Sequence, residues 1–277
     1  MAAVLAATMA VAGCGGPGPA PAANPGPATA SAGSVPAPQP ATTGPATSAS
    51  AVPTGPAGGD SHGFPAALAG KDLERLPTNQ KVVALTFDAG ANADAVPSIL
   101  ATLARERITA TFFLTGDFVT KFPAAAKQIA AAGYPIGNHS TTHPAFAGLA
   151  NALIRHEVLT AAQDIQQVTG VDPKPLFRFP FGSKDAKALT EVNSLGYLAV
   201  RWTVDSLGWQ GTMNGTRTPD FTSQRVLAAA TPGEIVLMHV GSHPTDQSTL
   251  DADALPAVIT GLRERGYRFV TLATLVG

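Results

Sequence analysis

Residues 81–92 read KVVALTFDAGAN, and this stretch decides the fold of the chain. The β-branched and apolar run Val82–Leu85 predicts a strand that is buried on both faces. The run leads to Asp88, where the small residues Ala89 and Gly90 favour a turn. Parallel α/β folds carry their chemistry at the carboxyl ends of such strands. We therefore expect Asp88 to lie in a functional site.

Four later segments repeat this arrangement, in which a polar side chain stands at or just after the end of an apolar run. The polar residues are His139, Arg178, Asp205 and His239. Because the carboxyl ends of parallel strands meet at one edge of a sheet, we expect these four residues and Asp88 to form one site.

From about Phe64 onward, short apolar runs alternate with amphipathic segments. Strands are expected at residues 82–87, 109–114, 134–138, 176–179, 197–204, 234–240 and 267–271. Helices are expected at residues 94–107, 118–132, 151–169, 184–195, 223–230 and 253–265. This alternation predicts an α/β fold whose parallel sheet closes into a distorted (β/α)7 barrel, one strand short of the usual eight. An open doubly wound sheet is the alternative, although no GxGxxG or phosphate loop supports a nucleotide-binding version.

The composition divides the 277-residue chain into three parts, because residues 1–59 contain no Lys, Arg, Asp or Glu. Residues 1–14 resemble a lipoprotein signal: an alanine-rich apolar run ends in Val11-Ala12-Gly13-Cys14, and Cys14 would carry the lipid. The usual positive region is missing, which favours a true start upstream of Met1; a tail with a chance cysteine is the alternative. Residues 15–63 are dominated by Pro, Ala, Gly, Ser and Thr and predict a disordered linker. Residues 64–277 form the expected folded domain.

Charge and cysteine content exclude several classes of protein. The net charge is −1 and no basic stripe occurs, so we expect no nucleic-acid partner. A single cysteine excludes an internal disulfide and a cysteine-based zinc site. We expect a monomer that touches a membrane only through a lipid on Cys14.

The segment His139–His143 (HSTTH) is the most specific local signal for a metal. Two imidazoles at positions i and i+4 would lie on one face of a helical turn and could share one divalent cation. The same spacing also occurs as an ordinary surface pattern. The position of His139 directly after an expected strand favours the metal site.

The other three polar positions each have a functional and a structural interpretation. Arg178 begins the segment RFPFG at the end of an expected strand. If its side chain is buried, it needs a carboxylate partner, for which Asp88 is the candidate. Otherwise Arg178 is a surface arginine at a turn. Asp205 is either part of the site or a cap of the following turn. A lone histidine after an apolar strand, as at His239, is more often structural, but it falls on the same rim as the others.

Taken together, the motifs resemble those of NodB-type polysaccharide deacetylases, carbohydrate esterase family four. The resemblance runs from about residue 81 to residue 271, and its five motifs occur in the order of the family. The matching segments are Thr86–Gly90 (TFDAG), His139–His143 (HSTTH), Arg178–Gly182 (RFPFG), Asp205–Trp209 (DSLGW) and Leu237–His239 (LMH).

The resemblance implies a metal-dependent hydrolase. In this family a divalent metal, often zinc, is held by an Asp-His-His set, here represented by His139 and His143, and cobalt or nickel are alternatives. The metal lowers the pKa of its water and polarises the acetyl carbonyl. Asp88 would be the general base, and Arg178 would keep it ionised.

The resemblance also assigns the remaining residues. The tetrahedral oxyanion would be stabilised by the metal and by the backbone N–H of Phe181. His239, oriented by Asp205, would protonate the leaving amine, and Trp209 would belong to the substrate side of the site. The products would be acetate and a free amino sugar.

Two positions depart from the family pattern. Ala89 stands where the family has its metal-binding aspartate, and Gly208 replaces the acid before Trp209. The third ligand could then be an oxygen of Asn92 or Asp94, a water, or Asp88 itself. A further reading is that the site is inactive and the barrel only binds sugar.

These observations predict a hydrolase that removes N-acetyl groups from an acetylated extracellular or cell-wall glycan, either peptidoglycan or a chitin-like polymer. The expected location is the cell envelope or the outside of the cell. The alternatives are an O-acetyl esterase acting on sugars and a non-catalytic glycan-binding lipoprotein.

Overall fold

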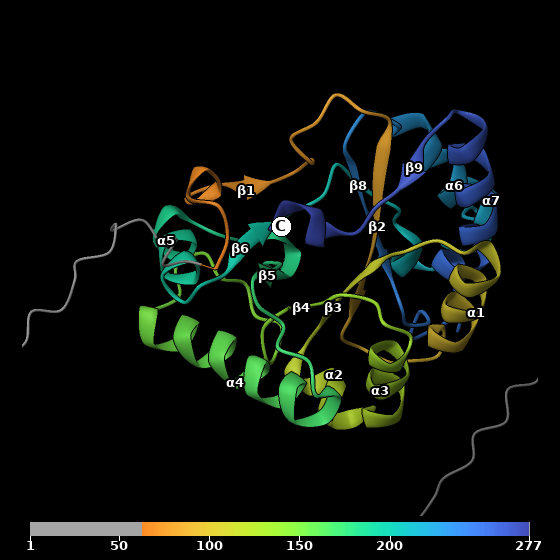
Figure 1. Cartoon of the computed structure of the whole chain (residues 1–277). Helices are drawn as coiled ribbons and strands as arrows, with labels where there is room; N and C mark the ends of the chain where they lie inside the picture. Colours follow the sequence, from red (N-terminus) through yellow and green to blue (C-terminus); the bar gives the residue numbers. More distant parts are fainter. Residues whose placement is uncertain (1–62, 277) are drawn as a thin grey trace, which may run out of the picture. The chain divides into compact units, whose positions relative to one another are not determined.

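The computed structural model describes residues 63–276 (Figure 1). The expected signal at residues 1–14, with Cys14, and the expected linker at residues 15–63, apart from Gly63, lie outside the described residues. Both therefore stay predictions. Within residues 63–276, no helix is long and apolar enough to cross a membrane.

Nine strands of the described chain form one sheet in the order β1-β6-β5-β4-β3-β2-β8-β7, and β9 pairs with β2. All of these strand pairs are parallel. The strands are β1 (Asp72–Leu73), β2 (Val82–Ala89), β3 (Thr111–Leu114), β4 (Ile136–Asn138), β5 (Leu176–Phe177), β6 (Leu198–Val200), β7 (Val204–Asp205), β8 (Glu234–His239) and β9 (Arg268–Phe269).

The sheet curls into a distorted, incompletely closed barrel. Strands β6 and β7 lie towards opposite ends of the strand order, yet only residues 201–203 separate them in the chain. This connector touches both sides, because the Arg201 N–H donates to the carbonyl of Leu73 and the Thr203 N–H donates to that of Ile235. The predicted α/β barrel is therefore confirmed, and the open doubly wound alternative is wrong.

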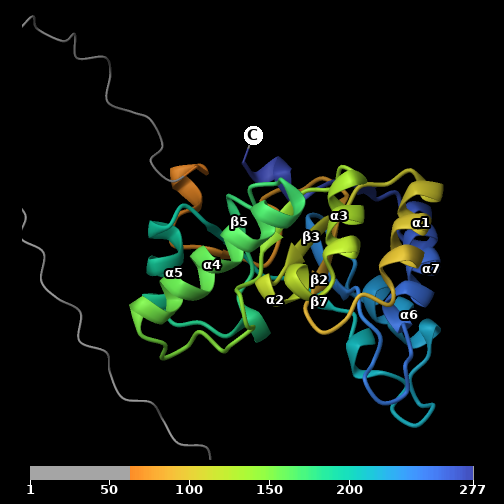
Figure 2. The same ribbon diagram turned by 90° about the horizontal axis from the view of Figure 1, so that it is seen from below.

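Helices surround the curled sheet on its outer side, as Figures 1 and 2 show from two directions. The α-helices are α1 (Val96–Glu106), α2 (Gly116–Lys121), α3 (Pro123–Ala131), α4 (Asn151–Thr169), α5 (Ala186–Ser194), α6 (Pro219–Ala229) and α7 (Leu250–Glu264). Short 3-10 turns occur at η1 (Ala66–Leu68), η2 (Pro180–Gly182), η3 (Gly208–Gln210) and η4 (Leu272–Leu275).

Strand β2 shows why the sequence folds in this way. Its alternate residues Val83, Leu85, Phe87 and Ala89 belong to the apolar cluster between the sheet and the outer helices. Val82 and Ala84 belong to a second cluster with residues of β6 and β8. Because both faces of the strand are covered, its apolar run is continuous rather than alternating. The same alternation places Asp88 on the face opposite Ala89.

Two expected elements are divided in the structure. The helix expected at residues 118–132 is α2 followed by α3, because Pro123 lacks an N–H and begins a new helix. The strand expected at residues 197–204 is β6 and β7, separated at the point where the connector bridges the two sides of the barrel. The short strand β1 was not expected, since two residues carry no periodicity.

Candidate active site

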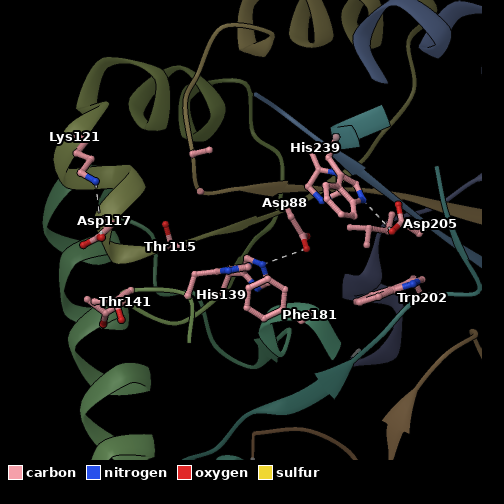
Figure 3. Close-up of a pocket in the computed structure, with 16 residues that line it drawn as sticks. Asp88, Thr115, Asp117, Lys121, His139, Thr141, Phe181, Trp202, Asp205 and His239 are labelled. Atoms are coloured by element: carbon pink, nitrogen blue, oxygen red, sulfur yellow. Dashed lines mark hydrogen bonds and ion pairs between the residues drawn. The ribbon is translucent and has the colours of Figure 1, made fainter. Parts of the chain in front are cut away.

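A cavity of about 580 Å³ opens at the carboxyl ends of the strands (Figure 3). All of the predicted site residues except Arg178 line it. The lining residues are Asp88, Gly90, Ala91, Thr115, Asp117, Lys121, His139, Thr141, Thr142, His143, Phe181, Trp202, Asp205, Trp209, Leu237 and His239. The loops that the sequence separates by up to 151 positions therefore converge on one hollow, as expected for the carboxyl edge of a parallel sheet.

Asp88 and Arg178 form a buried ion pair beneath the cavity. Asp88 Oδ1 lies 2.7 Å from Arg178 Nη1, and the Arg178 side chain is fully buried. The other guanidinium nitrogens of Arg178 donate to the carbonyls of Val200 and Arg201. The predicted pairing is confirmed, and the surface-arginine alternative is wrong. Burial alone would raise the pKa of Asp88, but the charges of Arg178 and His139 hold that pKa below its usual value.

His139 stands directly against this carboxylate. Its Nδ1 lies 2.8 Å from the carbonyl oxygen of Arg178, and because a carbonyl can only accept, Nδ1 carries the proton. Its Nε2 lies 3.3 Å from Asp88 Oδ2. Burial lowers the pKa of His139, so the neutral ring presents an unprotonated Nε2 to a carboxylate oxygen. Two acceptors facing each other at this distance are compatible with a cation between them.

The second imidazole approaches through a loop rather than a helical turn. The helical turn predicted for residues 139–143 is wrong, since Ser140 and His143 have positive φ angles of 69° and 61°. Glu157 of α4 holds the loop by accepting from the N–H groups of Thr141 and Thr142. These contacts with a distant helix override the i, i+4 pattern.

The loop nevertheless brings the two rings together. The centroids of His139 and His143 are 4.8 Å apart. Burial and the neighbouring His139 lower the pKa of His143 to about 4, so the ring is neutral at neutral pH. Two neutral imidazoles next to a carboxylate are a donor set that suits a divalent transition metal.

Two of the alternatives for the third ligand, Asn92 and Asp94, are engaged elsewhere, whereas Asp88 Oδ2 faces His139 Nε2. Ala89 is buried in the outer cluster. Asn92 Oδ1 accepts from the Ser242 N–H at 2.8 Å, and Asp94 Oδ2 accepts from Ser242 Oγ at 2.5 Å, so both side chains are engaged in joining two loops. Within residues 63–276, no group of three His, Cys, Asp or Glu side chains is arranged as a metal site. His139 and His143 thus fit a cation as two of its ligands and leave the other positions to water or substrate.

His239 lies on the other side of Asp88, as Figure 3 shows. It ends β8 opposite Asp88 in the parallel register. The side chain that contacts its ring is Asp251 of α7, whose Oδ2 lies 3.3 Å from His239 Nδ1. Burial would lower the pKa of His239, but the hydrogen bond and charge of Asp251 outweigh it and raise that pKa.

Asp205 therefore does not make the hydrogen bond that was expected to orient His239. Its carboxylate accepts from the Leu207 N–H at 2.8 Å and from Trp209 Nε1 at 3.1 Å. The indole of Trp209 in turn lies 6.3 Å from the His239 ring, centroid to centroid. Asp251 was not predicted as a site residue, because an acid in the first turn of a helix is ordinarily explained by the helix dipole.

Two exposed aromatic side chains stand at the cavity. The Phe181 side chain is 69% exposed and its ring contacts His143, with centroids 4.5 Å apart. Phe181 has a φ of 57°, an uncommon conformation for a bulky residue that turns the RFPFG loop over the histidine pair. Trp209 is 49% exposed near His239.

Comparisons with known proteins agree with this geometry. The family model described as polysaccharide deacetylase matches residues 75–200. The peptidoglycan-N-acetylglucosamine deacetylase of Bacillus cereus is 34% identical over 199 residues, which cover 72% of this chain and 70% of that protein. The chain belongs to the polysaccharide deacetylase family. The resemblance inferred from the five motifs is thereby confirmed.

Solved structures of the polysaccharide deacetylase family share the fold. PdaA of Bacillus subtilis, a family 4 carbohydrate esterase, has a TM-score of 0.66 at 30% identity and covers 74% of this chain and 85% of its own. The wild-type protein BA3943 of Bacillus anthracis is a CE4 family pseudoenzyme. Its structure has a TM-score of 0.68 at 30% identity, and the match covers 76% of this chain and 70% of that chain. A BA3943 mutant has restored enzymatic activity. The fold of this family is therefore not sufficient for activity.

Proposed function

We propose that this protein removes N-acetyl groups from a cell-wall glycan by hydrolysis, in the envelope or outside the cell. The observation that carries the proposal is the position of Asp88, which is paired with Arg178 and lies between His139 and His239 at one cavity. A base and an acid whose pKa values are shifted in opposite directions are the arrangement that general acid–base hydrolysis needs.

Asp88 acts as the base. Its lowered pKa keeps the carboxylate ionised at neutral pH, and Oδ1 is held by Arg178 while Oδ2 faces the His139 side of the cavity. The carboxylate accepts a proton from the water that attacks the acetyl carbon. Positioned proton transfer of this kind contributes about 10²–10⁴-fold to a rate.

His139 and His143 hold a divalent cation, for which zinc is the first candidate and cobalt or nickel are alternatives. When bound, such a cation supplies Lewis-acid polarisation of the acetyl carbonyl and lowers the pKa of water. Burial keeps both imidazoles neutral, and the hydrogen bond to the Arg178 carbonyl fixes the ring of His139.

His239 acts as the acid. Its raised pKa favours a protonated ring, which gives its proton to the amide nitrogen as the bond between that nitrogen and the acetyl carbon breaks. The backbone N–H of Phe181 is the proposed donor to the oxyanion. Water adds its oxygen to the acetyl carbon, so the products are acetate and a free amino sugar.

The shape of the site favours a polymer over a single sugar. Phe181 and Trp209 offer aromatic faces on which sugar rings stack. A second hollow of about 880 Å³ shares Trp202 and Asp205 with the first and continues it past Arg225. Peptidoglycan is the proposed substrate, since two relatives are peptidoglycan deacetylases. Chitin-like chains are the alternative substrate, since the chitooligosaccharide deacetylase of Azorhizobium caulinodans is 28% identical to this chain.

Acetate release tests the proposal. The purified protein, first treated with chelator and then given zinc or cobalt, is expected to release acetate from peptidoglycan or from chitin oligosaccharides. Asp88→Asn is expected to lose at least about 10²-fold in rate, whereas Asp172→Asn on the exposed surface keeps it. No release from any N-acetylated glycan would contradict the proposal, and release from O-acetylated xylan alone would identify an O-acetyl esterase.

A non-catalytic glycan-binding role is the second candidate. Ala89 in the place of the family's third ligand and the pseudoenzyme relative favour it. This role predicts glycan binding that persists in chelator and in His139→Ala, without acetate release. The deacetylase instead predicts that His139→Ala abolishes turnover.

A further inference from the structure

The space beside Gly208 is occupied by a carboxylate from another element. A Cβ placed on Gly208 would lie 2.4 Å from Asp251 Oδ1, 2.5 Å from Asp251 Cγ and 2.9 Å from the Asp251 backbone nitrogen, all inside normal contact. The φ angle of Gly208 is not in the left-handed region, so its backbone does not require glycine. Position 208 therefore lacks a side chain because Asp251 of α7 takes that space.

Both oxygens of this carboxylate are engaged. Asp251 Oδ2 accepts from the backbone N–H of His239 at 2.8 Å and lies 3.3 Å from His239 Nδ1. Asp251 Oδ1 accepts from Ser206 Oγ at 2.5 Å. Asp251 is 3% exposed and Ser206 is fully buried, so the orientation of the carboxylate is set by contacts that water does not replace.

We propose that Asp251 of α7 is the positioning residue of His239, the task that the resemblance had given to Asp205. The inference rests on the proposed function, because it concerns the acid of that reaction.

The contact has a definite chemical consequence for His239. A carboxylate can only accept, so the Nδ1 atom of His239 carries a proton towards Asp251. The transferable proton then resides on Nε2, the other ring nitrogen. The other acids that act on His239 are Asp88 of β2 and Asp205 of β7, and their carboxylates are committed to Arg178 and Trp209.

A role in stabilising the start of α7 does not account for these contacts. Asp251 and Asp253 both lie in the first turn of α7, where acids favour the helix dipole. Asp253 is exposed, and its carboxylate accepts from Thr249 Oγ1. Asp253→Asn is therefore the matched control: the same residue type in the same turn, without contact to His239.

The experiment compares three proteins with the wild type: Asp251→Asn, Asp251→Ala and Asp253→Asn. Three quantities are measured: kcat and KM for acetate release, the high-pH limb of the rate profile, and the NMR titration of the His239 ring in chelator-treated protein. The last needs no activity. Asp251→Asn keeps the size of the side chain and decides the question if Asp251→Ala fails to fold.

Asp251→Ala is expected to lower kcat about 10–100-fold with little change in KM, in line with other outer contacts that orient a site residue. In both single variants at position 251, the high-pH limb and the His239 titration move to lower pH. Asp253→Asn changes none of the three.

An unchanged His239 titration in Asp251→Asn would overturn the inference. If no protein releases acetate while the His239 titration shifts in both variants at position 251, the proposed function fails and the positioning of His239 by Asp251 stands. If wild type releases acetate and the titration does not shift, the proposed function stands and the inference fails.

Discussion

The carboxylate of Asp88 lies 2.7 Å from the guanidinium of Arg178, although 90 positions separate the two residues in the chain. Both side chains are buried, and the remaining Arg178 nitrogens bond to the carbonyls of residues 200 and 201. The pair therefore connects the ends of separate strands and keeps the proposed base ionised. Removing one partner leaves an uncompensated charge in the interior.

Arg178→Met is expected to lower the free energy of unfolding by about 3–5 kcal/mol, because it leaves Asp88 buried without its partner. The double variant Asp88→Asn/Arg178→Met should regain part of this loss, since it removes the isolated charge. Urea unfolding of the wild type, the two single variants and the double variant measures the coupling free energy between Asp88 and Arg178. Lys121→Met, at an exposed pair with Asp117, serves as control and should change stability by less than about 1 kcal/mol. Additive effects of the two buried substitutions would show that the pair does not act as a unit.

His143→Ala is expected to weaken cation binding at least about tenfold, because it removes one of the two imidazole ligands. Isothermal titration of chelator-treated protein with zinc measures this without reference to activity. His156→Ala on the exposed surface of α4 removes a histidine of the same type away from the cavity and should leave the affinity unchanged. Equal zinc affinity in wild type and His143→Ala would remove this histidine from the site.

Ala89→Asp tests which face of β2 position 89 occupies. Ala89 is fully buried in the outer cluster, so a carboxylate there has no polar partner and should lower the free energy of unfolding by about 2 kcal/mol or more. We expect thermal unfolding to show this loss equally in chelator and in zinc. A zinc-dependent recovery of stability together with a faster rate would show instead that the strand end turns and that the third ligand has been restored.

The contribution of Glu234 to the stability of the fold should fall as the pH rises from 5 to 8. Glu234 at the start of β8 is fully buried, and neither of its carboxylate oxygens has a hydrogen-bond partner of good geometry in the described part of the chain. Burial raises its pKa from 4.5 to about 7. A folded-state pKa above the unfolded value means that the contribution is fully present below pH 4.5 and is lost as the pH rises through about 7.

Glu234→Gln should remove this dependence and make the protein more stable than wild type at pH 8, by about 3 kcal/mol. Unfolding midpoints measured between pH 5 and pH 8 check the prediction. Glu264→Gln, an exposed residue at the end of α7, is the control and should leave the pH dependence unchanged. An identical pH dependence in wild type and Glu234→Gln would contradict the assignment.

Local sequence patterns predicted the barrel and most of the candidate site. The continuous apolar run of β2 signalled a strand covered on both faces, and the strand-end positions of Asp88, His139 and His239 signalled a common edge. The need of a buried arginine for a carboxylate correctly paired Arg178 with Asp88. These predictions succeed because a buried strand and its end are visible as a pattern of apolar and polar types in consecutive residues.

Predictions that depended on distant contacts were less successful. The i, i+4 spacing of His139 and His143 indicated that the rings meet, but not the loop that brings them together, which depends on Glu157 of α4. Asp205 stood in the expected motif, yet its carboxylate bonds to Trp209 and not to His239. Neither contact has a signature in the residues that surround it.

The amino-acid sequence by itself determined the alternation of strands and helices, the buried partner of Arg178 and the set of polar residues at the carboxyl edge. Those features follow from hydrophobic periodicity and from the cost of burying a charge, which act on neighbouring residues and on residue type. Only the tertiary structure decided which acid contacts His239, because Asp251 reaches it from a helix that the curl of the sheet brings against β8. In the sequence, Gly208 indicates only that an acid of the family motif is missing. The structure shows that Asp251 fills the space beside Gly208.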